Sequence, residues 1–218
     1  MTARRTSPAP EIDAAPRRQR GRPRRYDADA ARRAIAAQFR SAGYEATSLD
    51  DISAVTGMRR PSLYLAFGDK QAMYLACLKD YNATVEIALA EELGRSAPLG
   101  EVLRSLFRRL LSIYRPSTGA KGCLALAAWF EASSAGMIIK DEILHARRRL
   151  EQALLHRIEL ACADSDLQAG VSPATALRLV IATLDMVAIQ SRGDLRTESI
   201  ASNADMLVAL ICAASPTA

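Results

Sequence analysis

The sequence predicts an all-helical protein of about nine helices, with a small three-helix domain followed by a larger helical domain. Three observations predict this fold class. Aromatic residues make up only 5% of the 218 residues, which disfavours a β-sandwich or barrel core. Alanine, leucine and arginine, which favour helices, are abundant. Apolar residues recur three and four positions apart in segments bounded by glycines and by capping residues.

The first 25 residues are expected to be an unfolded basic arm. Eight arginines and two acidic residues give this arm a net charge of +6, so the rest of the chain sums to −1. The arm has no apolar periodicity with which to fold alone. A basic arm before a nearly neutral body favours a polyanionic partner, with a solubilising leader as the alternative.

The end of the arm reads QRGRPRR, and its Arg-Gly-Arg-Pro core resembles an AT-hook. An AT-hook is an extended segment that lies along the narrow minor groove of A·T-rich DNA. Glycine permits close approach to the groove, and proline keeps the backbone extended. We therefore expect DNA contacts from four arginines of the arm: Arg20, Arg22, Arg24 and Arg25.

Residues 26–72 are expected to form the three-helix domain. The first helix begins at Asp27 and stops at Gly43, because glycine is a common C-terminal stop. Its buried stripe is expected to be Ala31, Ile35, Phe39 and Ala42.

The second helix is short and begins at Ser48. An acid three residues later, Asp51, completes a capping-box pattern. Ile52 and Val55 are expected to face the core, and the helix ends at Gly57.

The third helix is expected over Pro61–Phe67, because proline is favoured in a first turn. Leu63 and Phe67 are expected to face inward, and Gly68 ends the helix. Two short helices joined by a glycine-containing turn predict a helix-turn-helix, with a purely structural helix corner as the alternative.

Residues 73–218 are expected to form the larger helical domain, which the fourth helix enters from Asp69. The triplet Arg147–Arg149 is expected on an outward helix face. Residues 174–190 are apolar on nearly every side, so this helix must be covered on two sides. Helical segments are expected at about 69–92, 103–114, 123–134, 137–163, 174–190 and 197–213, with a loop at 115–122.

Several classes of function and location are disfavoured. No run of eighteen uncharged apolar residues and no secretory signal is present, so we expect no membrane contact. The four cysteines lack a CxxC spacing, which favours reduced thiols in the cytoplasm. His145 and His156 lie about 16 Å apart on one helix, too far to share a metal ion. The sequence carries no GxSxG, HExxH or P-loop, so we expect no enzyme, no cofactor and no metal site.

The segment Tyr44–Lys70 resembles the DNA-binding domain of the TetR (tetracycline-repressor-like) family of bacterial transcription regulators. The resemblance is carried by Thr47-Ser48, Ile52, Gly57, Leu63-Tyr64, Phe67 and Lys70. It implies a cytoplasmic homodimer that binds double-stranded DNA and pairs through helices 174–190 and 197–213. It also implies a small-molecule effector bound in the larger domain.

The residues themselves support contacts to a DNA duplex. Arg59 and Arg60 precede the third helix and are expected to reach guanines, or only phosphates as the alternative. Ser62 is expected to meet a phosphate or a base edge. Tyr64 lies opposite Leu63 and is expected to meet a phosphate, with a partly buried core tyrosine as the alternative. The remaining contacts to DNA phosphates are expected from Thr47, Ser48 and Lys70, which lie at helix starts.

The effector pocket is expected among aromatic and sulfur side chains of the larger domain, which line adaptable apolar sites. The alternative is that these side chains are plain core. Cys123 is expected to be either a reactive thiol or, more simply, a buried inert one. The candidate pocket residues are Phe107, Tyr114, Cys123, Trp129, Phe130 and Met137.

The leading hypothesis is therefore a ligand-responsive repressor that binds a palindromic operator as a dimer. An architectural DNA binder dominated by the basic arm is the second hypothesis. An enzyme that uses Cys123, or a small-molecule carrier, is the third.

Overall fold

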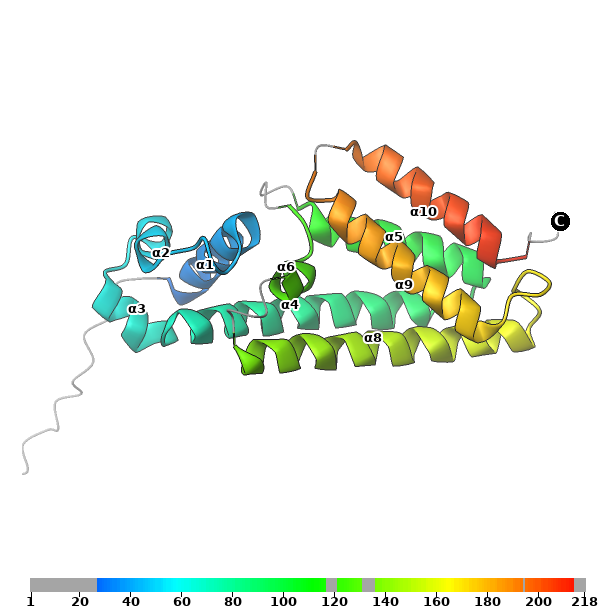
Figure 1. Ribbon diagram of the computed structural model, residues 1–218, viewed down its shortest axis with the longest axis horizontal. Helices are drawn as coiled ribbons and strands as arrows, with labels where there is room; N and C mark the ends of the chain where they lie inside the picture. The colour runs from blue at the N-terminus through cyan, green and yellow to red at the C-terminus, as the bar shows by residue number, and fades with distance from the viewer. Residues whose placement is uncertain (1–26, 117–120, 131–135, 194, 214–218) are drawn as a thin grey trace, which may run out of the picture.

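The computed structural model describes residues 27–116, 121–130, 136–193 and 195–213, and over these residues the chain is all-helical, as predicted. Three short helices form a small unit, and a long fourth helix leads from it into a larger helical body (Figure 1). The basic arm lies outside the described residues. The helices are α1 (Ala28–Ala42), α2 (Leu49–Thr56), α3 (Arg60–Phe67), α4 (Lys70–Leu93), α5 (Leu99–Tyr114), α6 (Leu124–Phe130), α8 (Met137–Ala163), α9 (Pro173–Gln190) and α10 (Thr197–Ile211).

The predicted ends of the first helices are correct to within about a residue, because their caps are local. Asp27 accepts hydrogen bonds from the backbone N–H groups of Asp29 and Ala30 at the start of α1. These bonds lower the pKa of the Asp27 carboxyl. At the start of α4, Asp69 accepts a bond from the N–H of Ala72. The helix starts are thus fixed by side chains that the sequence already displays.

The core of the small unit is formed by one apolar side of each helix. Phe39 of α1, Ile52 of α2 and Leu63 of α3 are all completely buried. Two expected core positions are wrong: Val55 is 45% exposed, and Ala42 at the end of α1 is exposed. Helix α2 has only eight residues, and Ile52 is its single buried one. Met58, in the turn that follows α2, is buried in this core.

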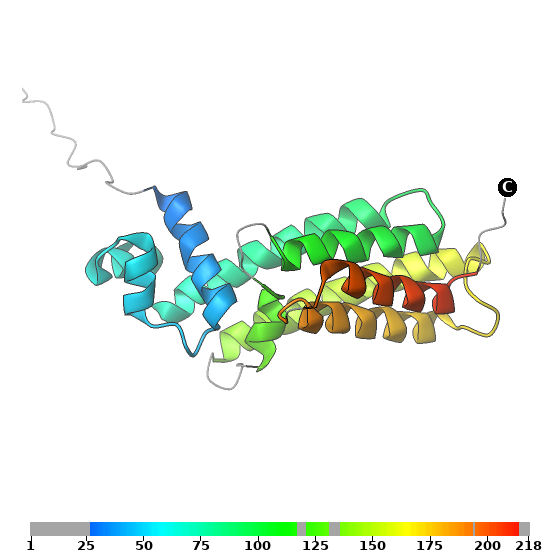
Figure 2. The same ribbon diagram turned by 90° about the horizontal axis from the view of Figure 1, so that it is seen from above.

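Aromatic packing joins the small unit to α4. The ring of Tyr74 is completely buried and meets Phe39 edge-on, with ring centroids 4.8 Å apart. The ring of Tyr44 lies 5.0 Å from Tyr74 on another side. Helix α4 continues into the larger body (Figure 2), so this cluster connects the two parts of the molecule.

The larger body is built around α4 and α8, which lie side by side, with α5, α9 and α10 covering one side of them (Figures 1 and 2). In the described part of the chain, α9 is the one helix long and apolar enough to cross a membrane. It packs on α8, α10 and α5, and it contains the charged residues Arg178 and Asp185. Its contacts therefore fit a packed helix of the larger body.

Candidate nucleic-acid interface and internal cavity

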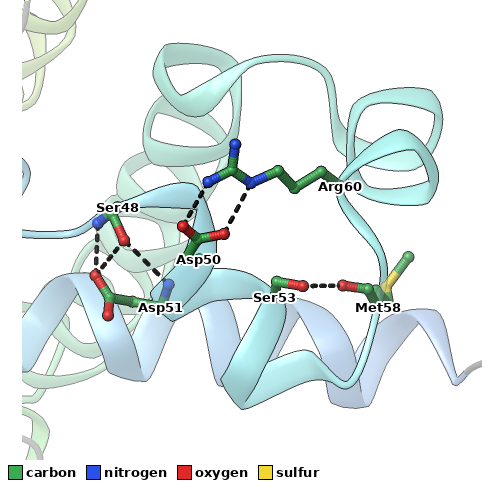
Figure 3. Close-up of polar contacts among 6 residues, drawn as sticks. All are labelled: Ser48, Asp50, Asp51, Ser53, Met58 and Arg60. Atoms are coloured by element: carbon green, nitrogen blue, oxygen red, sulfur yellow. Dashed lines mark hydrogen bonds and ion pairs between the residues drawn. The ribbon is translucent and has the colours of Figure 1, made fainter.

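Hydrogen bonds fix both ends of α2, including the turn that leads to α3 (Figure 3). The hydroxyl of Ser48 accepts from the N–H of Asp51 at 3.1 Å, and the Asp51 carboxylate accepts from the N–H of Ser48 at 2.7 Å. This is the predicted capping box, and its bonds lower the pKa of Asp51. At the other end, Gly57 adopts the left-handed conformation, with φ of 65°. The hydroxyl of Ser53 donates to the carbonyl of Met58 across the turn.

Helix α3 is fixed on the core by Leu63, and its exposed surface carries polar side chains as well as Leu65, which is 91% exposed. Leu63 is completely buried, whereas Tyr64 is 49% exposed. Arg59 and Ser62 are exposed on the first turn of the same helix. Tyr64 is thus about half exposed, which leaves its hydroxyl free to meet a phosphate as expected.

Arg60 is held by a residue that the sequence did not single out, Asp50 in the first turn of α2 (Figure 3). The Arg60 Nε lies 2.8 Å from Asp50 Oδ1, and its Nη2 lies 2.5 Å from Oδ2. The carboxylate raises the pKa of the guanidinium. The only sequence signal for this pair was an acid in a first helical turn, which is common for other reasons.

Two residues expected to contact the DNA backbone, Thr47 and Lys70, instead contact other groups of this protein. Thr47 is completely buried, and its hydroxyl donates to the carbonyl of Gly43 at 2.7 Å, so its side chain does not reach the surface. The Lys70 ammonium lies 4.4 Å from the centre of the Tyr44 ring and 3.4 Å from the Glu45 carbonyl oxygen. Ser48 remains exposed beside the first turn of α2. The four expected arm contacts, Arg20, Arg22, Arg24 and Arg25, lie outside the described residues.

A cavity of about 360 Å³ lies in the larger body among α4, α5, α6, α8 and α9. Of the expected pocket residues, Tyr114, Cys123 and Trp129 line it. Phe107 is buried in the core but is not part of the lining, and Phe130 and Met137 are exposed elsewhere. Most of the wall is aliphatic: Val85, Leu89, Leu110, Ala125, Leu126, Ile143, Leu144, Ala146, Leu150, Leu184 and Ala188.

The expectation that Arg147 faces outward with its two neighbours is wrong, because this arginine lines the cavity. Its Nη1 and Nη2 donate to the two carboxylate oxygens of Asp185 at 2.8 and 2.9 Å. Its Nε donates to Glu151 at 2.8 Å. These partners raise the pKa of Arg147, with Asp185 contributing most. Periodicity missed the contact because Asp185 lies 38 residues further along the chain.

The other charged and amide side chains of the cavity wall are also paired. Glu86 accepts hydrogen bonds from Arg149, and the Asn82 amide donates to Glu142 at 2.9 Å. The charged lining side chains are thus neutralised by ions of opposite sign. Such a wall offers no uncompensated charge to a bound molecule.

Cys123 has the environment of an inert thiol. Burial, the largest effect on this group, raises the pKa of its thiol. A raised pKa keeps the sulfur protonated at neutral pH, and the thiolate is the reactive form. The four cysteines of the chain, Cys77, Cys123, Cys162 and Cys212, form no disulfide. Among the residues that the structure describes, no group of three His, Cys, Asp or Glu side chains could hold a metal ion.

Arg40 connects the small unit with the cavity wall. It lies in the last turn of α1, and its Nη2 donates to the carbonyls of Ile113 at 2.6 Å and Gly122 at 3.1 Å. Its guanidinium carbon also lies 5.5 Å from the centre of the Tyr81 ring, which lines the cavity. One α1 side chain therefore joins α4 and both ends of the α5–α6 connection.

Replacing Arg40 by methionine keeps an unbranched apolar stem but removes the guanidinium that donates to both carbonyls. We expect Arg40→Met to lower the free energy of unfolding by about 2 kcal/mol, because two buried carbonyls lose a charged donor. Urea denaturation followed by circular dichroism measures this loss. The matched control is Arg33→Met, an exposed arginine of α1, which should change stability by less than about 0.5 kcal/mol. Equal losses in the two variants would contradict the structural role of Arg40.

Comparison with known proteins identifies relatives of both parts of the chain. Residues 29–77 match the profile of the bacterial regulatory proteins of the tetR family, and residues 101–207 match the tetracyclin repressor-like C-terminal domain. The HTH-type transcriptional repressor BdcR of Escherichia coli (strain K12) is 34% identical over 106 residues. That match covers 49% of this chain and 54% of BdcR, so the chain matches about half the length of that repressor.

Two further relatives extend the match over most of the chain. The uncharacterized HTH-type transcriptional regulator YezE of Bacillus subtilis (strain 168) is 27% identical over 168 residues, covering 72% of this chain and 87% of YezE. The solved structure of a cysteine mutant of the TetR family regulator CifR, in complex with 26-bp operator DNA, superposes with a TM-score of 0.72. It covers 86% of this chain and 98% of the CifR chain at 23% identity, and this likeness establishes the fold.

Proposed function

The chain belongs to the TetR family of bacterial regulatory proteins, and on this premise we propose that it is a cytoplasmic transcriptional repressor that binds operator DNA as a homodimer. The observation that carries the proposal is the exposed face of α3, with Arg59, Arg60, Ser62 and Tyr64 on a helix fixed from behind by Leu63. BdcR is named as a repressor, and the solved CifR complex contains operator DNA.

In this proposal the N-terminal end of α3 enters the major groove of the duplex. Arg60 reads a guanine, while Ser48, Arg59 and Tyr64 contact phosphates on either side of the groove. The arm adds contacts in the neighbouring minor groove through its arginines, with a preference for A·T base pairs. Base contacts determine the sequence, and phosphate contacts determine the register.

Selection of bound duplexes from a random DNA pool tests the proposed function. We expect a near-palindromic site whose half-sites are about one helical turn, or ~34 Å, apart. Arg60→Ala should then weaken binding to the selected site by about tenfold more than binding to random DNA, because it removes a base contact. The control is Arg108→Ala, which removes an exposed arginine of α5 and should leave both affinities unchanged. Equal binding to all duplexes would instead favour an architectural DNA binder.

We infer that the dimer forms through α9 and α10. One side of each of these helices packs inward, and apolar side chains remain exposed elsewhere on them, including Ile189, Met206 and Leu210. Covering such a surface with a second copy removes it from water. A dimer also places two α3 helices on one face of a duplex.

Leu210→Asp should convert the dimer into a monomer, because it places a charge in the middle of the apolar surface. Light scattering coupled to gel filtration should give twice the 23.6 kDa chain mass for the parent protein and a single chain mass for the variant. Ile87→Asp is the matched control, since Ile87 is an exposed apolar residue of α4, outside the proposed interface. A parent protein that runs as a monomer would contradict the proposed assembly.

We infer further that the effector is an uncharged, mainly apolar molecule bound in the cavity. The wall is largely aliphatic, and its charged residues already neutralise one another, as Arg147 and Asp185 do. An ionic ligand would lose its hydration without gaining a free partner. Binding in the cavity acts on DNA affinity only through unequal affinity for two arrangements of the dimer.

Two dyes that differ only in charge test the ligand class. N-phenyl-1-naphthylamine is uncharged, and 8-anilino-1-naphthalenesulfonate is the same skeleton with a sulfonate. We expect the uncharged dye to bind at least about tenfold more tightly, because the sulfonate would be desolvated without a partner. Quenching of Trp129, the single tryptophan of the chain and part of the cavity wall, reports the site. Ala146→Phe should abolish the quenching by filling the cavity, and tighter binding of the sulfonate would contradict the inference.

A further inference from the structure

We propose that Asp50 is a positioning residue for sequence recognition: its carboxylate holds Arg60 so that the free edge of the guanidinium faces a guanine. This inference rests on the proposed DNA-binding function. Two parallel contacts, Nε to Oδ1 at 2.8 Å and Nη2 to Oδ2 at 2.5 Å, form a bidentate pair between α2 and α3. A bidentate pair restricts both the position and the plane of the guanidinium.

The pair occupies only one edge of the guanidinium. An arginine side chain carries five N–H groups, and Asp50 accepts two of them, from Nε and Nη2. The edge formed by Nη1 and the second N–H of Nη2 therefore remains available, and Nη1 points away from Asp50 (Figure 3). Two adjacent donors on this edge match the O6 and N7 acceptors of a guanine in the major groove.

Holding the side chain in advance favours recognition for an entropic reason. A free arginine has many rotamers, and ordering it on a base opposes binding. Here Arg60 is already ordered by Asp50, although its own side chain is 53% exposed. Less conformational freedom is therefore lost when the guanine is bound.

The position of Asp50 is hard to explain for a DNA-binding surface unless it serves Arg60. Its side chain is 72% exposed beside the proposed contacts of α2 and α3, where a carboxylate repels phosphates. The capping of α2 does not require it, because Ser48 and Asp51 already form the capping box. A favourable interaction with the α2 dipole is the remaining alternative role.

The two roles predict opposite changes in DNA binding, so Asp50→Asn distinguishes them. If Asp50 positions Arg60, the variant should bind the selected site more weakly, and the ratio of selected to random affinity should fall by about tenfold. If Asp50 acts only through its charge, the variant should bind both duplexes more tightly by one common factor. The control is Asp29→Asn, because Asp29 occupies the first turn of α1 and has no ion pair among the described residues.

A double-mutant cycle with Arg60→Ala tests whether the effect acts through the guanidinium. In the Arg60→Ala background, Asp50→Asn should leave the affinity ratio unchanged, because no guanidinium remains to be positioned. Asp50→Glu, which keeps the carboxylate, should recover part of the ratio. Fluorescence anisotropy at one fixed salt concentration measures all affinities.

The outcomes separate this inference from the function on which it rests. A parent protein that prefers its selected site, with an unchanged ratio in Asp50→Asn, overturns the positioning role alone. An equal fall of the ratio in both Arg60 backgrounds also overturns it. A parent protein without any preference overturns the proposed function and this inference together. In the DNA-free protein, the 15Nε resonance of Arg60 should shift in Asp50→Asn and remain in place in Asp29→Asn, and an unshifted resonance would exclude the pair itself.

Discussion

The packing of Tyr74 against Phe39 and Tyr44 is the contact on which the rest of the structure depends. Tyr74 belongs to the second turn of α4, while Phe39 belongs to α1 and Tyr44 to the loop that follows it. Because Tyr74 is completely buried, α4 cannot turn relative to the small unit without disrupting that core. The same helix supplies Tyr81 and Leu89 to the cavity wall, so one rigid element extends from the DNA-facing unit to the cavity.

Local chemistry explains which parts of this fold were predictable from sequence. The capping box of Ser48 and Asp51, the stop at Gly57 and the inward side of Leu63 depend on residues within a few positions of one another. Val55 was misassigned because periodicity gives the face of a helix but not how much of that face its neighbours cover. In an eight-residue helix, that coverage depends on the following turn, where Met58 lies buried.

The polar contacts between the helices of the larger body and between α1 and that body were not predictable, because they join positions far apart in the chain. Arg40 reaches carbonyls 73 and 82 residues away, and Arg147 reaches Asp185 at a separation of 38 residues. An exposed arginine and an arginine that neutralises an acid in a cavity look alike in a helical pattern. Only the arrangement of the helices shows which carboxylate or carbonyl each one meets.

Arg40 also gives a physical reason why a ligand in the cavity would act on α1 as well as on α4. Tyr81 lies between the cavity and the Arg40 guanidinium, which in turn holds the carbonyls of Ile113 and Gly122. A ligand that displaces the Tyr81 ring therefore changes the contact that anchors the end of α1, even if α4 keeps its position. Within the described residues, the Arg40 Nε is buried without a hydrogen-bond partner, so this junction is less than fully satisfied as it stands. A shift of α1 relative to the cavity wall would therefore have to break these Arg40 contacts or exchange them for others.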